Sequence, residues 1–192
     1  IEYCGLFWHS DRNNYSPTKH QEKFLECQRL GIKLITIFED EWIFNRAVVE
    51  SRITSLVGKN TRIFARKCTI GTVAASVSSE LLTKWHIQGP RGSKSNISLS
   101  YGGEVVAVCT YGKPRYGKED IEILRFATKP GTTVVGGFSK LLKAVQKQTG
   151  ATTIVSFSDN RWGDGRVYAR AGMVRIGVTQ PSYWYFLPAE RK

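Results

Sequence analysis

Several features that would place the chain in a specialised class of protein are missing from its sequence. No run of apolar residues reaches 18, which excludes a membrane-spanning helix. No charged leader with an apolar segment opens the chain, so no signal peptide is visible, and a start at Ile rather than Met suggests a trimmed chain. The four cysteines lie far apart without a C-x-x-C pair, which argues against a zinc ribbon and against a disulfide framework. We interpret them as reduced thiols and expect a cytoplasmic protein.

Acidic residues are scarce in most of the chain. Residues 1–58 carry seven Lys and Arg against eight Asp and Glu, a net charge of −1, whereas residues 59–192 carry 21 against eight, a net charge of +13. This asymmetry predicts two domains, with a boundary near residue 58, and a polyanion as the partner of the second domain. We expect double-stranded DNA, because the basic residues are interleaved with aromatic ones. A basic surface that serves only solubility is the alternative.

Hydrophobic periodicity predicts alternating strands and helices, and therefore a mixed α/β fold. In the first domain we expect strands over 1–9 and 32–38 and helices over 18–30 and 42–57, each helix closed by a glycine. The second domain should hold more strands than helices. Its expected strands span 62–70, 97–101, 104–111, 121–128, 152–157, 173–177 and 183–187, and its expected helices span 76–84, 136–148 and 165–171.

Four polar side chains of the first domain could serve a phosphodiester. Glu2 lies in a strand that ends near a glycine, His9 follows in the next loop, and His20 and Lys23 are three residues apart on one helix face. A carboxylate suits Mg²⁺ or Mn²⁺, a histidine can orient or deprotonate water, and a lysine can stabilise developing charge. We therefore name Glu2, His9, His20 and Lys23 as catalytic candidates, with Glu2 as the metal ligand. A surface glutamate without a metal is the plainer alternative.

The second domain offers an anion site and several basic loops. Two glycines, a hydroxyl and a lysine lie at the start of the expected helix 136–148. Free backbone N–H groups and the helix dipole attract an anion to such a position. A tight turn that requires glycine for its backbone alone is the alternative. In the Gly-rich loop near residue 162, arginine can contact phosphate and tryptophan can stack on a base. The predicted DNA-binding residues are Arg66, Lys67, Gln88, Arg91, Lys94, Arg115, Lys140, Arg161, Trp162 and Arg166.

The first 42 residues carry a recognisable pattern. The stretch IEYCGLFWHS, followed by HQEKFLECQRLGIKLITIFEDEW, resembles the end of the nuclease domain of phage homing endonucleases, relatives of the very-short-patch repair endonucleases in the PD-(D/E)xK superfamily. All four catalytic candidates match that pattern. The sequence departs from it in two ways: no carboxylates precede the first strand, and Cys4 stands where this branch usually has Asn. The resemblance implies metal-dependent DNA cleavage by a longer form that carries the upstream acids.

The second domain resembles a different fold over roughly residues 62–187. The segments ARKC, HIQG, YGGEVVAVCTYGKPR, VVGGFSKLL and IVSFSDNRWGDGRVYARAG, with their late Y-x-x-x-G, are similar to the N-acetyltransferase fold in the style of phage DNA-modifying proteins. VVGGFSKLL stands where that fold has its pyrophosphate-binding turn, R-x-x-G-x-G/A. Here Thr133 or Val134 replaces the arginine and the glycines are adjacent, so the turn could bind a CoA-type cofactor or only phosphate.

These patterns predict a DNA endonuclease of phage homing type that uses Mg²⁺ or Mn²⁺. Residues 1–58 would be part of a PD-(D/E)xK-type nuclease domain, and residues 59–192 a basic N-acetyltransferase-like mixed-sheet domain that binds DNA. A phage-encoded protein of this type would act in the host cytoplasm. Two alternatives stay open: an acetyltransferase-fold enzyme that modifies a nucleobase with a CoA-type donor, and a DNA-binding module without cleavage activity.

Overall fold

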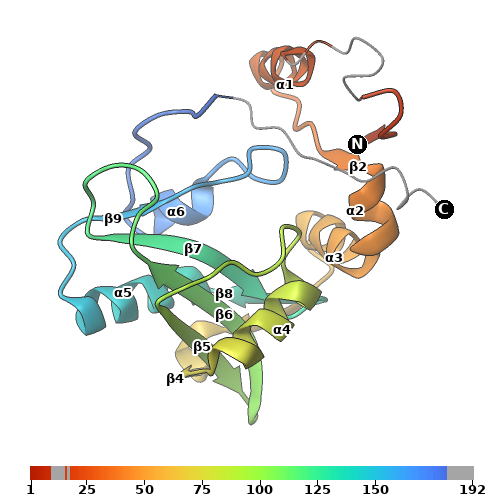
Figure 1. The fold of residues 1–192 in the computed structure, drawn as a ribbon. Helices are drawn as coiled ribbons and strands as arrows, with labels where there is room; N and C mark the ends of the chain where they lie inside the picture. Colours follow the sequence, from red (N-terminus) through yellow and green to blue (C-terminus); the bar gives the residue numbers. More distant parts are fainter. Residues whose placement is uncertain (10–15, 17, 181–192) are drawn as a thin grey trace.

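The computed structural model describes residues 1–9, 16 and 18–180 of the chain. Helices and strands are mixed along the sequence, which confirms the expected α/β class (Figure 1). In chain order the elements are β1 (Glu2–Cys4), α1 (Lys19–Arg29), β2 (Thr36–Phe38), α2 (Glu39–Phe44), α3 (Arg46–Leu56), β3 (Thr61–Phe64), a 3₁₀ turn (Ala65–Lys67), β4 (Thr69–Thr72), α4 (Ala75–Trp85), β5 (Ser95–Tyr101), β6 (Glu104–Gly112), β7 (Ile121–Thr128), β8 (Thr132–Val135), α5 (Gly137–Thr149), β9 (Ile154–Ser156) and α6 (Arg166–Arg170).

A five-stranded sheet organises the second half of the chain. Its strand order is β4-β5-β6-β7-β9, and every neighbouring pair is antiparallel except β7 and β9, which are parallel. The expected hairpin forms between β5 and β6, where Gly102 and Gly103 both have positive φ, as a tight two-residue connection requires. Two further pairs, β1 with β2 and β3 with β8, form small parallel sheets of their own.

Helix α5 covers one face of this sheet and supplies most of the main core. Its residues Phe138, Leu141, Leu142 and Val145 recur at helical spacing and are buried against alternate residues of β5, β6 and β7. Helix α4 packs on the opposite face, where Leu82 meets residues of β6 and β7 that lie between those contacting α5. The central strands of the sheet are therefore covered on both faces, and β6 is a nearly continuous apolar run, whereas the edge strand β4 is exposed.

The amino-terminal elements join the rest of the molecule through a separate apolar cluster, which we call the junction cluster. It consists of Ile35, Ile37, Val48, Val49, Ile87 and Trp162, all buried. Ile87 and Trp162 lie beyond residue 58, so the first 58 residues share this core with later elements. In Figure 1, α1, α2 and α3 lie to one side of the five-stranded sheet. The predicted domain boundary near residue 58 stays a prediction.

Several expected elements are shorter or divided. The expected strand 62–70 is interrupted by the 3₁₀ turn at Ala65–Lys67, and the expected helix 42–57 breaks at Asn45 and begins earlier, at Glu39. The expected strand 173–177 does not form, and the one at 183–187 lies outside the described residues. Among the residues that the structure describes, none of the helices has both the length and the apolar character that crossing a bilayer requires.

Candidate functional site

The turn from β8 into α5 has a backbone that only glycine fits well. Gly136 has a φ of +78°, in the left-handed region, and it forms the N-cap of α5 without a side-chain hydrogen bond. A Cβ at Gly137 would lie 3.0 Å from Cγ1 of Val134. The sequence therefore holds two glycines here because the chain turns sharply and passes close to β8, which leaves the first N–H groups of α5 without a side-chain cap.

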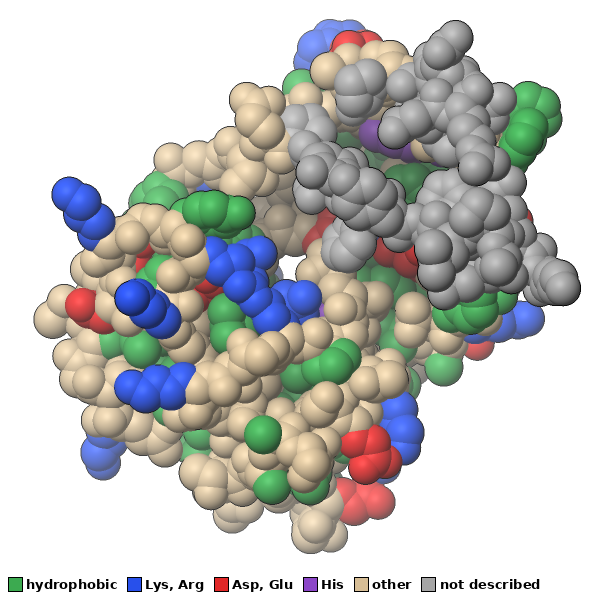
Figure 2. Space-filling model, viewed as in Figure 1, with side chains coloured by type: hydrophobic (Ala, Val, Ile, Leu, Met, Phe, Trp, Pro, Cys, Tyr) green, Lys and Arg blue, Asp and Glu red, His purple; other side chains and the backbone are tan. Residues whose placement is uncertain are grey.

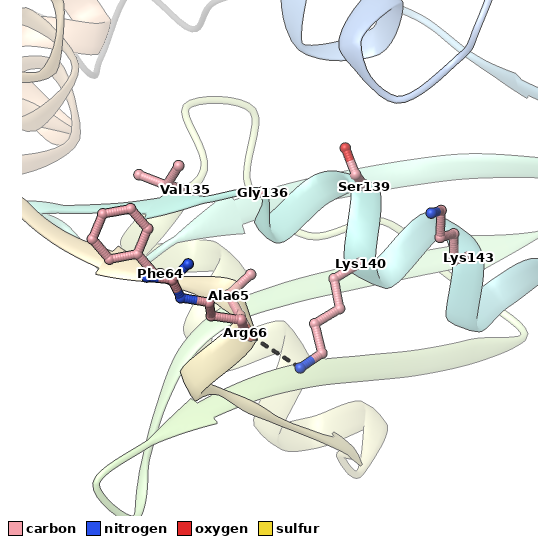
Figure 3. Close-up of a pocket in the computed structure, with 8 residues that line it drawn as sticks. All are labelled: Phe64, Ala65, Arg66, Val135, Gly136, Ser139, Lys140 and Lys143. Carbon is pink, nitrogen blue, oxygen red and sulfur yellow. Dashed lines mark hydrogen bonds between the residues drawn. The ribbon is translucent and has the colours of Figure 1, made fainter.

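A cavity of about 410 Å³ opens at this end of α5 (Figure 3). The turn from β3 into the 3₁₀ segment forms one wall and the first two turns of α5 form the other. Lys140 joins the walls, because its Nζ donates hydrogen bonds to the carbonyl oxygens of Ala65, at 2.9 Å, and Cys68, at 2.6 Å. The lining residues are Phe64, Ala65, Arg66, Val135, Gly136, Ser139, Lys140 and Lys143.

The cavity carries positive charge without a neutralising carboxylate in its lining. Arg66 is exposed and its guanidinium lies 5.1 Å from the ring centroid of Phe64, which orients it beside the opening. Lys143 is exposed one turn further along α5 (Figure 3). Together with the helix N-terminus, these two cations make the cavity chemically suited to an anion with several oxygens, such as a phosphate or diphosphate.

Strands β7 and β9 separate soon after they pair. Their parallel register covers only Ile121–Ile123 against Ile154–Ser156, whereas β7 continues to Thr128. The hydroxyl of Tyr168, on α6, lies 3.4 Å from the carbonyl oxygen of Phe157, just where β9 ends. Its ring packs edge-on against Phe138 in the first turn of α5, with centroids 4.9 Å apart. Burial raises the pKa of Tyr168, so its hydroxyl keeps its proton at neutral pH.

Three arginines lie around one buried carboxylate on β7. Glu122 of β7 is 1% exposed, and Arg115 donates to it from its backbone N–H and its guanidinium at 2.9–3.1 Å. Nη1 of Arg91 lies 3.6 Å from the same carboxylate. Burial, then the charges of Arg91 and Arg115, lower the pKa of the nearby Arg125, whose Nε donates to the carbonyl of Gly89. We call Arg91, Arg115 and Arg125 the arginine cluster. Its three positive charges and the one negative charge of Glu122 leave a net charge of +2.

Aromatic side chains flank the arginine cluster. The guanidinium of Arg115 lies 5.2 Å from the ring centroid of Phe157 and 5.9 Å from that of Tyr116, and both rings are exposed. Figure 2 shows Lys and Arg side chains gathered near the middle of one face of the molecule. Arg91 and Arg115 are among the residues predicted from the sequence, whereas Arg125 and Glu122 are not. Two charged residues inside the apolar strand IEILRFAT were the available signal.

The loop that carries Arg161 and Trp162 lies where the two halves of the chain meet. Trp162 is 6% exposed in the junction cluster, and the guanidinium of Arg52 lies 5.3 Å from its ring centroid. Arg161 donates to Asp159 at 2.7 Å and to Glu41 at 2.9 Å. Burial alone would lower the pKa of Arg161, but the two carboxylates together raise it. The structure therefore does not expose the expected Arg161–Trp162 surface.

The other predicted DNA-binding residues are distributed over separate places. Arg166 is exposed and paired with Asp164, and Lys67 and Lys94 are exposed on the 3₁₀ turn and before β5. Gln88 is half-buried, and its backbone N–H donates to the ring Nδ1 of His86. Arg66 and Lys140 belong to the α5 cavity, as described above. Contact of these residues with DNA stays a prediction.

The four predicted catalytic residues do lie together at the end of β1. Nζ of Lys23 is 2.6 Å from Oε1 of Glu2, and the rings of His9 and His20 stack with centroids 5.1 Å apart. Burial raises the pKa of Glu2, but the charges of Lys23, His20 and His9 together lower it by more than burial raises it. The net shift of the pKa is therefore downward. Among the described residues, the group of possible metal ligands found here is Cys4, His9 and His20, and it includes no carboxylate. The Mg²⁺ or Mn²⁺ site at Glu2 is untested.

Comparisons with known proteins indicate neither a nuclease nor a family. No family model matches the sequence, and the curated proteins give no significant match. Two solved structures are similar. The first is a protein of Deinococcus radiodurans R1 assigned as an acetyltransferase, with 15% sequence identity and a TM-score of 0.45, and the match covers 62% of this chain and 91% of that one. The second is an aminoglycoside acetyltransferase from an uncultured soil metagenomic sample in complex with sisomicin, with 13% sequence identity and a TM-score of 0.44, and the match covers 64% of this chain and 97% of that one. At these values the likeness carries no activity to this chain.

The predicted function as a phage homing endonuclease is wrong. The two solved structures named above are described as acetyltransferases, and neither is a nuclease. No evidence supports a PD-(D/E)xK domain, a hydrolase or a phage origin. The geometry agrees, because Glu2 pairs with Lys23 and no second carboxylate joins it in a ligand group within the described residues. What stands is a mixed α/β fold, and the alternative of an acetyltransferase-fold enzyme stays a prediction.

Proposed function

We propose that the chain is a group-transfer enzyme of acetyltransferase fold that modifies a nucleobase with a CoA-type donor. The observation that carries the proposal is the cationic cavity at the N-terminus of α5. A CoA-type donor supplies an activated acyl thioester. The chain's own residues must then hold the diphosphate of the donor, deliver a proton to its leaving group and bind the acceptor.

The α5 cavity fits the diphosphate. Two adjacent glycines let a ligand approach the uncapped N–H groups at the start of α5, and Ser139 offers a hydroxyl in the lining. The arginine that such turns carry in the acetyltransferase fold is absent, since Thr133 and Val134 stand there. Arg66 and Lys143 supply the cations instead, one from the 3₁₀ turn and one from α5.

Tyr168 is the candidate proton donor. Its hydroxyl lies at the end of β9, where the two parallel strands separate, and its ring packs on the first turn of the same helix that borders the cavity. Burial raises the pKa of this phenol, so it stays protonated at neutral pH and can donate a hydrogen bond, and then its proton, to the sulfur as negative charge develops there. Oη of Tyr168 would therefore protonate the leaving group.

The arginine cluster is the candidate acceptor surface. Glu122 fixes the orientation of Arg115 through three hydrogen bonds, so this guanidinium is held in place before a ligand arrives. The excess positive charge suits a phosphate backbone, and the exposed rings of Tyr116 and Phe157 can stack on bases. These features favour a nucleic acid over a small neutral acceptor.

Calorimetry with CoA and with pyrophosphate tests the donor half of the proposal. We expect both to bind the full chain, and Arg66→Glu or Lys143→Glu to weaken binding at least about tenfold, because each change replaces a charge-assisted contact with repulsion. Lys147→Glu, an exposed position near the far end of α5, is the matched control and should bind as the unchanged chain does. Absence of binding, or equal losses in all three variants, would contradict a diphosphate site at this cavity.

DNA binding without group transfer is the second candidate, favoured by the arginine cluster. Each phosphate contact contributes a slope of about −0.9 to the dependence of log affinity on log salt. We expect Arg91→Glu to weaken duplex binding and flatten this slope, whereas Lys19→Glu, on α1 of the near-neutral half, should leave the slope unchanged. A salt slope near zero for the unchanged chain would rule out both the second candidate and a nucleic-acid acceptor.

A further inference from the structure

Three side chains able to bind a metal converge at the end of β1. Cys4 is the last residue of β1 and is fully buried, His9 lies in the turn that follows, and His20 lies in the first turn of α1. One potential ligand atom from each lies within 4.8 Å of the other two. Three elements separated along the chain therefore bring one thiol and two imidazoles to a single point.

His9 is already oriented as a metal-binding histidine usually is. Its Nδ1 lies 2.9 Å from the carbonyl oxygen of Gly5, a bond in which the nitrogen carries the proton and the carbonyl accepts it. This bond leaves the lone pair on Nε2, and ligand histidines in proteins commonly use the same kind of bond to fix the ring. The stacking of His20 on His9, at an interplanar angle of 26°, holds the second ring beside the first.

The chemistry of this ligand set selects the metal. One cysteine with two histidines is a borderline-soft set, which suits zinc, whereas Mg²⁺ and Ca²⁺ prefer oxygen ligands. Zinc bonds of about 2.1 Å to nitrogen and about 2.3 Å to sulfur place neighbouring ligand atoms about 3.3–3.8 Å apart in a tetrahedral site. Atoms that already lie within 4.8 Å of one another reach that spacing by small side-chain rotations.

The charges around the cluster are balanced before a metal arrives. Glu2 lies two residues before Cys4, on the same side of β1, and its carboxylate is neutralised by Lys23 at 2.6 Å. The carboxylate nearest the cluster is therefore already paired in the absence of a cation.

We propose that Cys4, His9 and His20 form a zinc site that ties β1, the turn after it and α1 together. Zn²⁺ replaces the proton of the Cys4 thiol, one Zn–S bond forms as the S–H bond breaks, and the proton leaves to solvent without any change of oxidation state. Both histidines bind as neutral imidazoles. The site is independent of the α5 cavity and does not rest on the proposed group transfer.

Cobalt is the probe for this site, because a Co²⁺–thiolate bond gives a charge-transfer absorption that oxygen or nitrogen ligands do not give. The full chain, first stripped with a chelator, should develop this absorption with one equivalent of Co²⁺, and Zn²⁺ should abolish it by displacement. Cys4→Ser should remove the absorption. Cys27→Ser is the matched control, since Cys27 is a half-buried thiol on α1 outside the ligand group, and it should leave the absorption intact.

A second variant keeps the test decisive if Cys4→Ser does not fold. His9→Gln keeps a polar side chain at a half-buried position, and it should weaken zinc binding at least about tenfold, since even the loss of a bond that merely orients a ligand costs that much. Circular dichroism verifies that each variant is folded. The proposal is overturned by absence of the absorption in the unchanged chain, by its loss in Cys27→Ser and not in Cys4→Ser, or by unchanged zinc affinity in His9→Gln.

Discussion

The first 58 residues and the remainder of the described chain are stabilised in different ways. The later part has a five-stranded sheet with helices on both faces and a large buried cluster around α5. The first part has two strands of three residues each, and its helix α1 buries no residue completely. Large apolar side chains such as Trp8, Phe44 and Leu25 stay at least half exposed there. The amino-terminal part therefore depends on the junction cluster and on polar pairs for its position.

The net charge separates the same two regions. The near-neutral first part carries the Cys4–His9–His20 group, whereas the later part, at +13, carries the α5 cavity and the arginine cluster. The two proposed binding functions, one for a polyanion and one for a soft cation, therefore lie in different regions of the chain. Each can thus be disrupted without the other.

Truncation inside the α5 core should have the largest effect. Leu141 is fully buried, so Leu141→Ala removes buried methyl groups and leaves a cavity, at a cost of about 2–5 kcal/mol in the free energy of unfolding. Leu25→Ala on α1, where the leucine is 52% exposed, should cost within about 0.5 kcal/mol. Urea denaturation followed by circular dichroism measures both. Equal losses for the two variants would show that the regions share one core.

Truncation in the junction cluster should have an intermediate and more local effect. Trp162→Ala removes a buried ring that packs with Ile37, Val48 and Ile87. We expect it to lower the free energy of unfolding by about 3 kcal/mol, at the lower end of the range for truncation of a buried tryptophan. The lower end is expected because Nε1 of Trp162 is buried without a hydrogen-bond partner among the described residues. Limited proteolysis should then cleave first within residues 1–58. Earlier cleavage within β5–β7 would contradict a junction role for this residue.

Acid should loosen the junction through His86. Burial, then the charges of Arg125 and Arg52, lower the pKa of His86 to about 3. The neutral ring, whose Nδ1 accepts the N–H of Gln88, is thus the folded form. In the unfolded chain His86 takes up a proton near pH 6.5, whereas in the folded chain it does so only near pH 3. The contribution of the neutral His86 to the free energy of unfolding is therefore complete above pH 6.5 and is lost as the pH falls toward 3. His86→Asn, which keeps an acceptor without a titrating group, should flatten that part of the curve of unfolding free energy against pH. An unchanged curve would assign the acid sensitivity to other groups.

The sequence predicted elements well where the pattern was local and repeated. The helix expected over 136–148 is α5 (Gly137–Thr149), because Phe138, Leu141, Leu142 and Val145 define one face and two glycines fix its start. The start of α2 was missed, since the expected helix began at residue 42 and left out Glu39–Asp40–Glu41. Three acids in a first helical turn instead stabilise a helix N-terminus.

The candidate sites were predictable only in part, because most of their contacts join residues far apart in sequence. The glycine turn before α5 indicated an anion site, but the convergence of Arg66 on it depends on the pairing of β3 with β8. Trp162 looked like a surface residue in a Gly-rich loop. Its burial results from packing against Ile35–Val49, more than a hundred residues earlier, which no local pattern reveals.

Mass analysis of nucleosides tests the central claim of group transfer most directly. Duplex DNA is incubated with the full chain and acetyl-CoA, digested to nucleosides and analysed for an added acetyl mass. We predict a modified nucleoside with the unchanged chain and a yield about 100-fold lower with Tyr168→Phe, which removes only the proton of the phenol. Bound DNA without any modified nucleoside, or equal yields from the two forms, would contradict the claim.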